Sequence, residues 1–396
     1  MPTPVLRGAL TAALALLALA TPAVAGTSPA TAAPALPAPP ALPVTAGASA
    51  PPVLSRPTGP HRVGTTTLHL VDGSRPDPWV TTEKARELMV SLWYPSRASR
   101  GRRAPYMTPR ESALLLKGQG IEGVPGEVLS GTRTNAFVGV PPLGRGHGLP
   151  LVVLSPGFTL PRSSLTALAE DLASRGYVVA GVDHTYESFG TVLPGGRTAT
   201  CVACEEWGSP GFGPKATRSR AADVSFVLDR LTGAHPSWRH AGLIDPSRVA
   251  AAGHSLGGGS ATWTMLADTR VRAGVNMDGA FHVPLPAGGL GRPFLILGEP
   301  KAHEPDGKDT TWRRDWPRMT GWRRWLTVDG ADHVSFTDYP LLTGQLGLGA
   351  GPLPGPRALE ITRRYVGAFF DLHLRGRSRP LLDRPSPRYP EIRFWG

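Results

Sequence analysis

Short apolar segments and amphipathic segments alternate along most of the chain. Within residues 86–94 every second side chain is apolar, at Leu88, Val90 and Leu92, which is the period of a half-buried strand. Together with residues 65–71, this segment predicts an antiparallel hairpin at the edge of a sheet. Further apolar runs predict strands at residues 149–154, 177–182, 248–253, 273–277, 294–297 and 325–328, the last of which is the final strand expected in the chain.

Segments with helical periodicity separate these strands. Leu165, Leu168 and Leu172 share one face of a helix that Gly176 ends. Similar apolar faces occur within residues 224–231 and 356–374. Strands that alternate with helices predict an α/β fold with a mostly parallel central sheet, helices on both faces and an antiparallel N-terminal edge.

The N-terminal part of the chain differs in composition from the rest. Arg7 precedes an apolar run at residues 9–20, and Ala23 and Ala25 offer the small residues that signal peptidase reads. The next segment consists mainly of Ala, Pro, Thr and Ser, a composition that cannot bury a core. We therefore expect a secreted protein with a signal peptide at residues 1–25, a flexible linker at 26–58 and a single folded domain at 59–396.

The net charge of the chain is strongly positive. Lysine and arginine number 42 against 30 acidic residues, which gives +12 at pH 7 and is compatible with an anionic partner. The arginines are spread along the chain and form no basic stripe, and no nucleic-acid-binding motif accompanies them. We expect a solvated basic surface and no nucleic-acid partner, with transient attraction to an anionic lipid surface as an accessory effect.

The two cysteines, Cys201 and Cys204, lie close together in a segment flanked by glycines. In an exported protein this pair predicts a local disulfide that acts as a structural staple. The alternative is a redox Cys-x-x-Cys motif, which requires a strand-to-helix setting that these flanks do not offer. The pair belongs to an irregular insertion at residues 184–215, for which we expect the role of a pocket wall or partial lid.

Residues 253–257 match the pattern Gly-x-Ser-x-Gly. In α/β-hydrolases this pattern is the nucleophile elbow, a sharp strand-to-helix turn that exposes the serine hydroxyl. Gly253 and Gly257 relieve crowding at such a turn, with His254 and Leu256 directly beside the serine. In a chain with 48 glycines the five residues alone are a weak signal, but an apolar strand precedes them and a helix of small residues follows. We therefore predict that Ser255 is a catalytic nucleophile.

A catalytic serine needs a base, and the base needs an acid that fixes its tautomer. In this fold the acid and then the histidine follow the serine, each on a loop after a later strand. His333 fits this order because it lies between the last predicted strand and the last helix, whereas His303 lies in a charged loop after the preceding strand. The pattern leaves the acid open between Asp278, which ends the strand at 273–277, and three carboxylates one strand later: Glu299, Glu304 and Asp306.

Several further segments resemble the type II, plasma-like family of platelet-activating factor acetylhydrolases. They are LWYPS at 92–96, LSPGF at 154–158, LASRGY at 172–177, VDH at 182–184, GHSLGG at 253–258 and HVSFTD at 333–338. The resemblance spans most of residues 59–375. It implies an α/β-hydrolase fold and places the acid after the strand that follows the nucleophile strand, at Asp278.

The oxyanion of the transition state also needs hydrogen-bond donors. The fold predicts the backbone N–H of Leu256, directly after the nucleophile, and that of Phe158, in the loop after the strand at 149–154. The family resemblance points to the same two positions. The chain departs from the family at Pro156, where a histidine commonly stands, and proline removes a donor from this loop without removing the predicted one.

These residues predict two-step ester hydrolysis by Ser255, Asp278 and His333, without cofactor or metal. The resemblance implies an esterase for short-chain carboxylic esters, including the sn-2 acyl esters of phospholipids. One alternative is a lipase or cutinase-like polyester hydrolase. Another is an exported binding protein that keeps the fold without catalysis. The expected partner is a small ester or lipid substrate, and the chain carries no signal for an oligomeric state.

Overall fold

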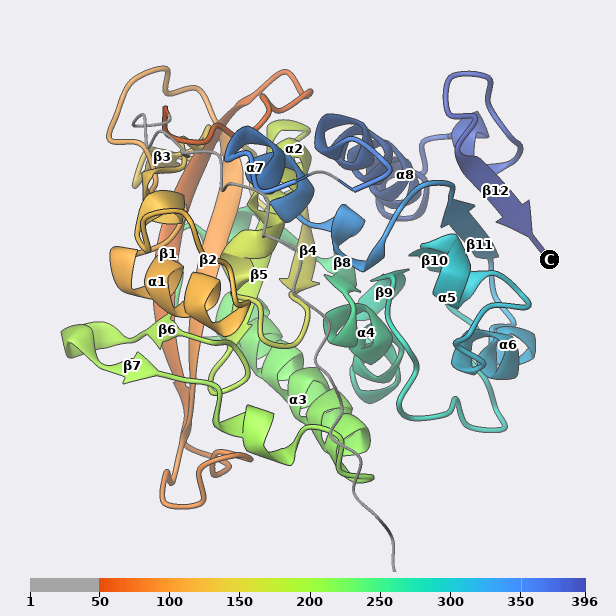
Figure 1. The fold of residues 1–396 in the computed structure, drawn as a ribbon, viewed down its shortest axis with the longest axis horizontal. Coiled ribbons are helices and arrows are strands. Elements are labelled where there is room, and N and C mark those ends of the chain that lie inside the picture. Colours follow the sequence, from red (N-terminus) through yellow and green to blue (C-terminus); the bar gives the residue numbers. More distant parts are fainter. Residues whose placement is uncertain (1–49, 350) are drawn as a thin grey trace, which may run out of the picture. The chain divides into compact units, whose positions relative to one another are not determined.

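The computed structural model describes residues 50–349 and 351–396, and a ten-stranded sheet forms its centre (Figure 1). The strand order is β12-β11-β10-β9-β8-β4-β5-β2-β1-β3. The strands from β11 to β5 in this order run parallel, β2 is antiparallel to β5 and β1, and β12 is antiparallel to β11. Their bounds are β1 Arg62–Asp72, β2 Arg86–Ser96, β3 Phe137–Val138, β4 Leu149–Ser155, β5 Val178–His184, β8 Ile244–His254, β9 Val271–Met277, β10 Phe294–Gly298, β11 Arg323–Val328 and β12 Ile392–Trp395.

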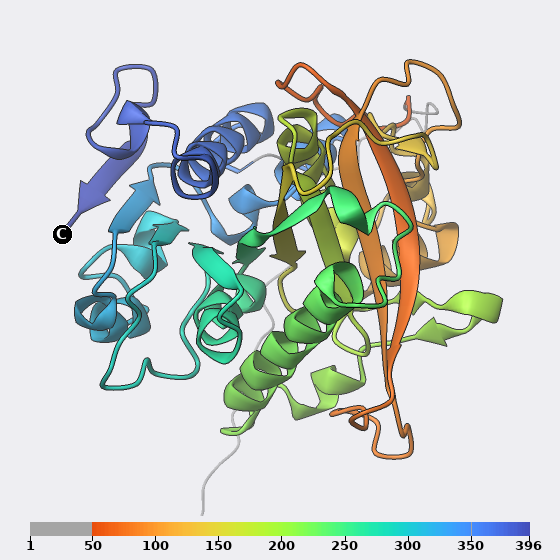
Figure 2. The ribbon, with the colours of Figure 1, turned by 180° about the vertical axis from the view of Figure 1, so that it is seen from behind.

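Helices cover both faces of this sheet, as the front and back views show (Figures 1 and 2). α2 (Thr166–Ser174) and α8 (Gly355–Arg375) pack on one face. α3 (Phe212–Thr232) and α4 (Leu256–Ala267) pack on the other. The shorter helices are α1 Pro109–Gly118, α5 Pro300–His303, α6 Thr311–Asp315 and α7 Tyr339–Gln345. Within the described residues, no helix is long and apolar enough to span a membrane.

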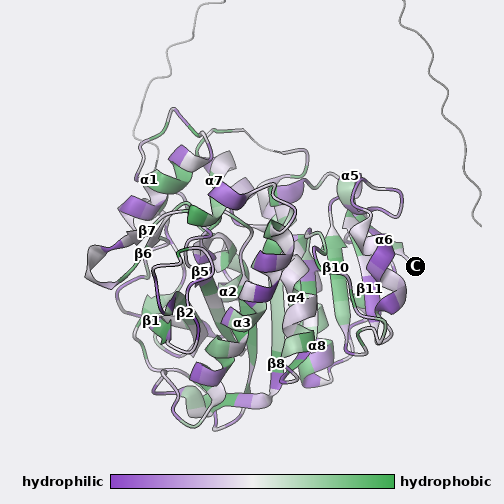
Figure 3. Cartoon of the chain, turned by 90° about the horizontal axis from the view of Figure 1, so that it is seen from below, coloured by the Kyte–Doolittle hydropathy of each residue, from purple (hydrophilic) through white to green (hydrophobic). Residues whose placement is uncertain are grey.

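Alternate residues of the central strands belong to the two faces. In β4, Val152 and Leu154 pack under α2 and α8, whereas Leu151 and Val153 pack under α3 and α4. All four are at most 1% exposed, and each such side chain contributes about 1.5–3 kcal/mol when it is buried. A sheet covered on both sides favours apolar residues on both faces, and the buried parts of these strands are mostly apolar, as in β4 and β10 (Figure 3).

The predicted α/β-hydrolase fold is confirmed, with its antiparallel N-terminal edge. The expectation that the strand at 325–328 is the last one is wrong, because β12 pairs with β11 beyond it. Trp395 Nε1 donates to Thr327 Oγ1 at 2.9 Å and joins the two strands. The segment carries arginine and two aromatic residues after a proline-rich stretch, so its short pattern gives little strand signal.

The ordered contacts of the domain begin before the expected boundary at residue 59. Val53 forms a bridge with Arg133, and Leu54 is 1% exposed in the core. Thr58 donates two hydrogen bonds to the Asp171 carboxylate. The last residues of the predicted linker thus pack against the domain, while the predicted signal peptide and linker residues 26–49 lie outside the described residues.

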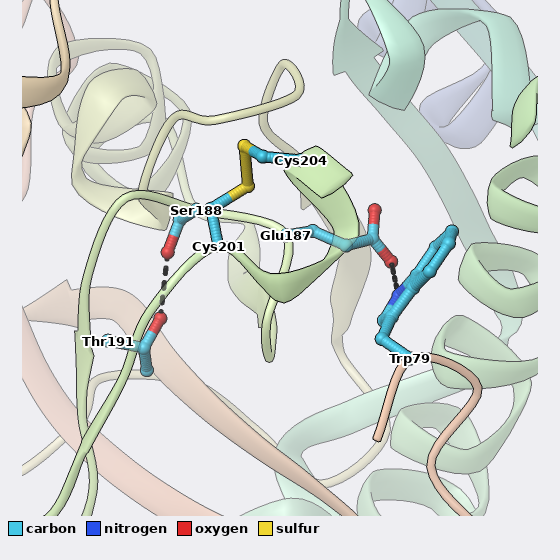
Figure 4. The surroundings of a disulfide bond; sticks show 6 residues. All are labelled: Trp79, Glu187, Ser188, Thr191, Cys201 and Cys204. Carbon is cyan, nitrogen blue, oxygen red and sulfur yellow. Dashed lines mark hydrogen bonds between the residues drawn. A yellow bond between two sulfur atoms is a disulfide. The ribbon is translucent and has the colours of Figure 1, made fainter. Parts of the chain in front are cut away.

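The insertion at residues 184–215 is more regular than expected. It holds the two-stranded sheet of β6 (Thr191–Val192) and β7 (Thr198–Ala199), followed by a 3₁₀ segment at Val202–Glu206. A disulfide joins Cys201 to Cys204 at the start of this segment (Figure 4). Although the short strand β7 precedes the pair, the segment that follows is a short 3₁₀ segment outside the central sheet and not the helix of a βαβ unit. This setting favours the structural staple over a redox motif.

Candidate active site

Ser255 lies at the carboxyl edge of the sheet, between β8 and α4. Its backbone has φ 53° and ψ −125°, a conformation that costs free energy for a residue with a side chain. The Ser255 N–H donates to the carbonyl oxygen of Met277 at 2.8 Å and ties the turn to the end of β9. The hydroxyl group thereby stands at the N-terminus of α4, where the helix dipole favours negative charge.

The glycines around Ser255 are required by close packing. A Cβ on Gly257 would lie 2.2 Å from the carbonyl oxygen of Ser155, and a Cβ on Gly253 would lie 2.5 Å from the same oxygen. A Cβ on Gly279 would lie 1.9 Å from the carbonyl oxygen of Ser255. Carbon–oxygen contacts normally stay at about 3.3–3.6 Å, so side chains at these positions would force the elbow apart.

His333 and Asp278 reach Ser255 from two other loops. His333 begins the 3₁₀ segment His333–Phe336 after β11, and Asp278 directly follows β9. His333 Nε2 lies 3.0 Å from Ser255 Oγ, and His333 Nδ1 lies 2.6 Å from Asp278 Oδ2. The Asp278 side chain is 1% exposed, whereas that of His333 is 54% exposed. The structure therefore brings the three residues named from the sequence into one hydrogen-bonded chain that opens to solvent.

The three other carboxylates that the sequence left open make different contacts. Glu299 caps α5 by accepting from the backbone N–H groups of Lys301 and Ala302. Glu304 lies 3.3 Å from Arg393, and Asp306 is exposed. None of the three contacts His333, so Asp278 alone among the four candidates contacts the histidine.

The second oxygen of Asp278 has partners of its own. Asp278 Oδ1 accepts from the Glu299 N–H at 2.6 Å and lies 2.8 Å from His303 Nδ1. Burial would raise the pKa of Asp278, but the hydrogen bonds from His303 and His333 outweigh burial and lower it. The sequence pattern missed this role of His303, because two residues 25 positions apart carry no local signal of their contact.

His254, beside Ser255, contacts the loop that carries His333. Its Nε2–H donates to the backbone carbonyl oxygen of His333 at 2.7 Å, and the two rings lie 4.7 Å apart. Burial, followed by the nearness of His333, lowers the pKa of His254 to about 3. His254 is consequently neutral at physiological pH and holds the backbone of the loop that carries His333.

The predicted oxyanion donors face the same edge of the sheet. Leu256 is the first residue of α4, and Phe158 lies in the loop after β4. Among the described residues, neither backbone N–H has a hydrogen-bond acceptor, which leaves both available to a ligand. The loop is held in place because the Thr159 N–H donates to Glu187 O at 2.8 Å and the Phe189 N–H donates to Thr159 O at 3.1 Å.

A buried ionic cluster supports this loop from below. The Arg220 guanidinium donates to the carbonyl oxygen of Pro156 and, at 2.7 Å, to Glu187 Oε2. Glu187 Oε1 accepts from Trp79 Nε1 at 3.1 Å (Figure 4). Asp223 on α3 completes the cluster by binding Arg86 at 2.9 Å. Removal of one member would leave a buried charge without its partner.

His184 and Asp183, at the end of β5, belong to this supporting layer. His184 Nδ1 lies 2.7 Å from Asp223 Oδ2, and its Nε2 lies 3.1 Å from Ser155 Oγ. Asp183 pairs with Arg162. Both residues are at most 2% exposed. They pack and orient the loops under the site and do not form its surface.

Aromatic side chains line the outer side of the loop after β4 that carries the predicted donor Phe158, which we call the oxyanion loop. Phe158 stacks on Trp207 at a ring distance of 5.1 Å and meets the edge of Phe212 at 4.8 Å. Trp79 lies 5.6 Å from Phe212. Trp207 is 62% exposed, so an apolar platform from the insertion at 184–215 stands beside the predicted oxyanion donor.

A separate cavity of about 260 Å³ lies between β1, β2 and the segment before α1. Ser255 and His333 do not line it, and the chemistry of the candidate site therefore does not depend on it. Within the described residues, no group of three or more His, Cys, Asp or Glu side chains is placed to hold a metal ion.

The fold and the similar proteins define the class of this chain as an α/β-hydrolase that hydrolyses carboxylic esters. A family model described as platelet-activating factor acetylhydrolase, isoform II, matches residues 47–193 and 235–350. The chain belongs to this family. The resemblance seen in the sequence motifs is thereby confirmed.

Individual relatives agree with this family. A "Probable 1-alkyl-2-acetylglycerophosphocholine esterase" of Arthroderma benhamiae is 29% identical over 86% of this chain and 93% of that protein. A "Platelet-activating factor acetylhydrolase" of Canis lupus familiaris is 24% identical over 72% of this chain and 71% of that protein. The solved ferulic acid esterase from Streptomyces cinnamoneus is 45% identical, with a TM-score of 0.78, over 88% of this chain and 100% of its own.

Proposed function

We propose that the protein hydrolyses small carboxylic esters through an acyl-enzyme formed on Ser255. The observation that carries this proposal is the continuous contact from Ser255 Oγ to His333 Nε2 and from His333 Nδ1 to the Asp278 carboxylate, at 3.0 and 2.6 Å. These are the distances at which a base removes the serine proton and an acid orients the base.

The reaction runs in two steps. Ser255 Oγ attacks the ester carbonyl while His333 Nε2 takes its proton, and the imidazolium then gives that proton to the leaving alcohol oxygen. A water molecule enters, loses a proton to His333 and attacks the acyl-enzyme, which releases the acid and restores Ser255. The backbone N–H groups of Leu256 and Phe158 stabilise the oxyanion of both tetrahedral intermediates.

For the substrate we propose a compact acyl group, with the short sn-2 acyl ester of a phospholipid as the first candidate. The family, whose members include acetylhydrolases and an acetylglycerophosphocholine esterase, supports this choice. The half-exposed His333 fits an ester that is presented at the surface and not drawn into a deep tunnel.

A second candidate is the ester of an aromatic acid. The exposed Trp207, stacked on Phe158, offers a flat apolar surface next to a predicted oxyanion donor, and such surfaces bind aromatic rings by stacking. The 45% identity to a ferulic acid esterase supports the same class. For this candidate, Trp207→Ala should lower kcat/KM for an aromatic-acid ester about tenfold and leave kcat/KM for a simple acetyl ester nearly unchanged.

The test is an ester series on the purified protein, from acetyl to long acyl chains, with a short sn-2 phospholipid and a hydroxycinnamate ester included. Ser255→Ala should reduce kcat by roughly 10⁴- to 10⁶-fold on every substrate. The exposed Ser99→Ala serves as the matched control and should retain full activity.

Each outcome of this series has a definite meaning. Activity that rises with acyl length or on an insoluble polyester would favour the lipase or cutinase-like alternative. Equal activity of Ser255→Ala and the unaltered protein would refute the mechanism. Absence of turnover on all esters would favour the non-catalytic binding protein.

We also propose that the protein is exported and that its signal peptide ends at Ala25. The apolar run at residues 9–20 and the small residues at Ala23 and Ala25 support this proposal. Intact mass measurement of the protein from culture medium should give a chain that begins at Gly26. A cell-retained chain of full length would contradict it.

A further inference from the structure

His303 occupies a position between two carboxylates on the side of Asp278 away from the nucleophile. Its Nδ1 lies 2.8 Å from Asp278 Oδ1, and its Nε2 lies 3.1 Å from Asp309 Oδ2. An ionised carboxylate only accepts hydrogen bonds. Both ring nitrogens must therefore donate, and this geometry requires a doubly protonated imidazolium.

The ring is fixed by its surroundings. His303 is 4% exposed and stacks on Trp312 of α6 at a ring distance of 4.1 Å. Its carbonyl oxygen accepts from Trp325 Nε1 of β11 at 2.7 Å. The distal carboxylate is held as well, because the Thr311 N–H donates to Asp309 Oδ1 at 2.7 Å. The contact to Asp278 is thus built into three elements and does not depend on a mobile side chain.

The charges around the pair agree with this protonation state. Burial alone would lower the pKa of His303, but its hydrogen bonds to Asp278 and Asp309 raise it to about 9. The pKa of each of the two carboxylates is lowered, with burial opposing and hydrogen bonds prevailing. The other titratable groups near Asp278 are His333 on its Oδ2 side and His254, which is neutral. Beyond them, Glu304 next to His303 is paired with Arg393 of β12.

We propose that His303 is a positioning residue of the active site, a cationic brace that orients Asp278 toward His333 and sets the pH range of the reaction. The proposal rests on the proposed function of Ser255, Asp278 and His333. Held at Oδ1 by His303 and by the Glu299 N–H, the carboxylate presents Oδ2 to His333 Nδ1.

The brace also affects the base through its charge. During acylation His333 becomes an imidazolium, so that one carboxylate is flanked by two cations. The positive charge on His303, which is present below about pH 9, should disfavour a second positive charge on His333, because like charges that share a carboxylate repel each other. Its removal should therefore move the acidic limb of kcat/KM to higher pH, since the base is then protonated more readily.

The first experiment measures kcat/KM against pH for His303→Asn and for the unaltered protein. Asparagine keeps a donor toward Asp278 without the charge. We expect the midpoint of the acidic limb to rise by roughly 0.5 to 1 pH unit. The pH-independent value of kcat/KM should fall about tenfold, because the charge-assisted hydrogen bond to Asp278 is weakened. His69→Asn is the matched control, because His69 also contacts a carboxylate (Glu87, 2.7 Å) but lies on β1 away from the site.

The second experiment does not depend on turnover. Histidine resonances of the Ser255→Ala protein are followed by NMR against pH, with His303→Asn and Asp309→Asn each added in turn. We expect one histidine to titrate near 9, to disappear in His303→Asn, and to titrate closer to neutral pH in Asp309→Asn.

The outcomes separate this inference from the proposed function. If Ser255→Ala remains active, the proposed function fails irrespective of His303. If Ser255→Ala is inactive but no histidine titrates above about 8, or if His303→Asn loses activity without a shift of the acidic limb, His303 is a packing residue and the brace is refuted.

Discussion

At the scale of single residues, the site depends on how one carboxylate divides its two oxygens. Asp278 Oδ2 accepts a hydrogen bond from His333, while Oδ1 accepts hydrogen bonds from His303 and from the Glu299 N–H. Asp278 itself has a positive φ of 60°, a conformation that is uncommon outside glycine. Strain of this kind persists where surrounding contacts outweigh it, and here those contacts are the ones that aim the carboxylate.

Replacement of this carboxylate should reveal its role. Asp278→Asn should lower kcat by about 10³- to 10⁴-fold at neutral pH, because an amide no longer fixes the tautomer of His333 or stabilises its imidazolium. The measurement is turnover of a soluble acetyl ester. Glu304→Gln replaces a carboxylate one strand later that has an exposed partner, and it is the control. Its kcat should stay within about threefold of that of the unaltered protein. A large loss of kcat in Glu304→Gln and a small one in Asp278→Asn would show that Glu304 is the acid.

His303 also makes the free energy of unfolding depend on pH. Its pKa in the folded protein is raised to about 9, above the unfolded value of about 6.5. A raised pKa contributes stability that is complete below pH 6.5 and is lost as the pH rises to 9.

Urea unfolding of the unaltered protein and of His303→Asn between pH 5 and 10 checks this contribution. The difference in unfolding free energy should reach up to about 3 kcal/mol at the acidic end, shrink between pH 6.5 and 9, and keep only its pH-independent part above pH 9. A difference that stays constant across this range would mean that His303 is not charged in the fold.

At the scale of elements, α3 links the sheet to the oxyanion loop. It carries Arg220, which reaches the Pro156 carbonyl oxygen and Glu187, and Asp223, which holds Arg86 and His184. The loop that bears Phe158 is therefore positioned by charges on a helix far from it in the sequence. Buried pairs of this kind contribute more to geometry than to net stability.

Loss of one member of this cluster should affect both stability and rate. Arg220→Met leaves the buried Glu187 carboxylate without its nearest cation, and only Arg86, at 3.6 Å, remains. We expect about 3–5 kcal/mol lower unfolding free energy. Where the variant folds, kcat should fall and KM should change little, since the proposed donor in the oxyanion loop, the Phe158 N–H, would act on the transition state.

A neighbouring arginine on the same helix provides the comparison. Arg218 is exposed and lies over the Trp263 ring at 5.4 Å. Arg218→Met should change kcat by less than about twofold. An equal loss of kcat in Arg218→Met and Arg220→Met would show that the ionic cluster does not position the oxyanion loop.

At the scale of the whole molecule, long-range contacts collect the active site at one edge of the sheet. Ser255, Asp278 and His333 each follow a parallel strand, so that their loops meet at the carboxyl edge. The insertion at 184–215 adds the aromatic wall beside them, and its disulfide closes a ring of only four residues, Cys201 to Cys204.

Removal of this disulfide should act locally. The chain-entropy relation for so short a ring gives at most about 2 kcal/mol, and we expect Cys201→Ser with Cys204→Ser to lower the melting temperature by only a few degrees. Turnover of a small acetyl ester should be retained. The kcat/KM for an aromatic-acid ester should fall if the segment that carries Trp207 becomes more mobile. Loss of all activity in thermally intact protein would instead indicate a redox or catalytic role of the pair.

The amino-acid sequence predicted much of this fold because the signals involved are local. Apolar patterns marked eight of the ten strands in the large sheet to within a few residues, and only the two-residue β3 and the short β12 had no predicted counterpart. The Gly-x-Ser-x-Gly pattern located the elbow where the structure has Ser255 with a positive φ. The short β12 was missed, because pairing with β11 and not its own pattern makes it a strand.

Chain order placed His333, yet spacing could not separate Asp278 from the later carboxylates; the resemblance to a known family made that choice. His303 and Arg220 had no sequence signal as parts of the site. The sequence by itself determined most of the elements, the elbow and the chain order of the proposed catalytic groups, since these follow from neighbours along the chain. Only the tertiary structure decided which oxygen of Asp278 meets which histidine and which charges support the oxyanion loop, because those contacts join residues 25 to 64 positions apart.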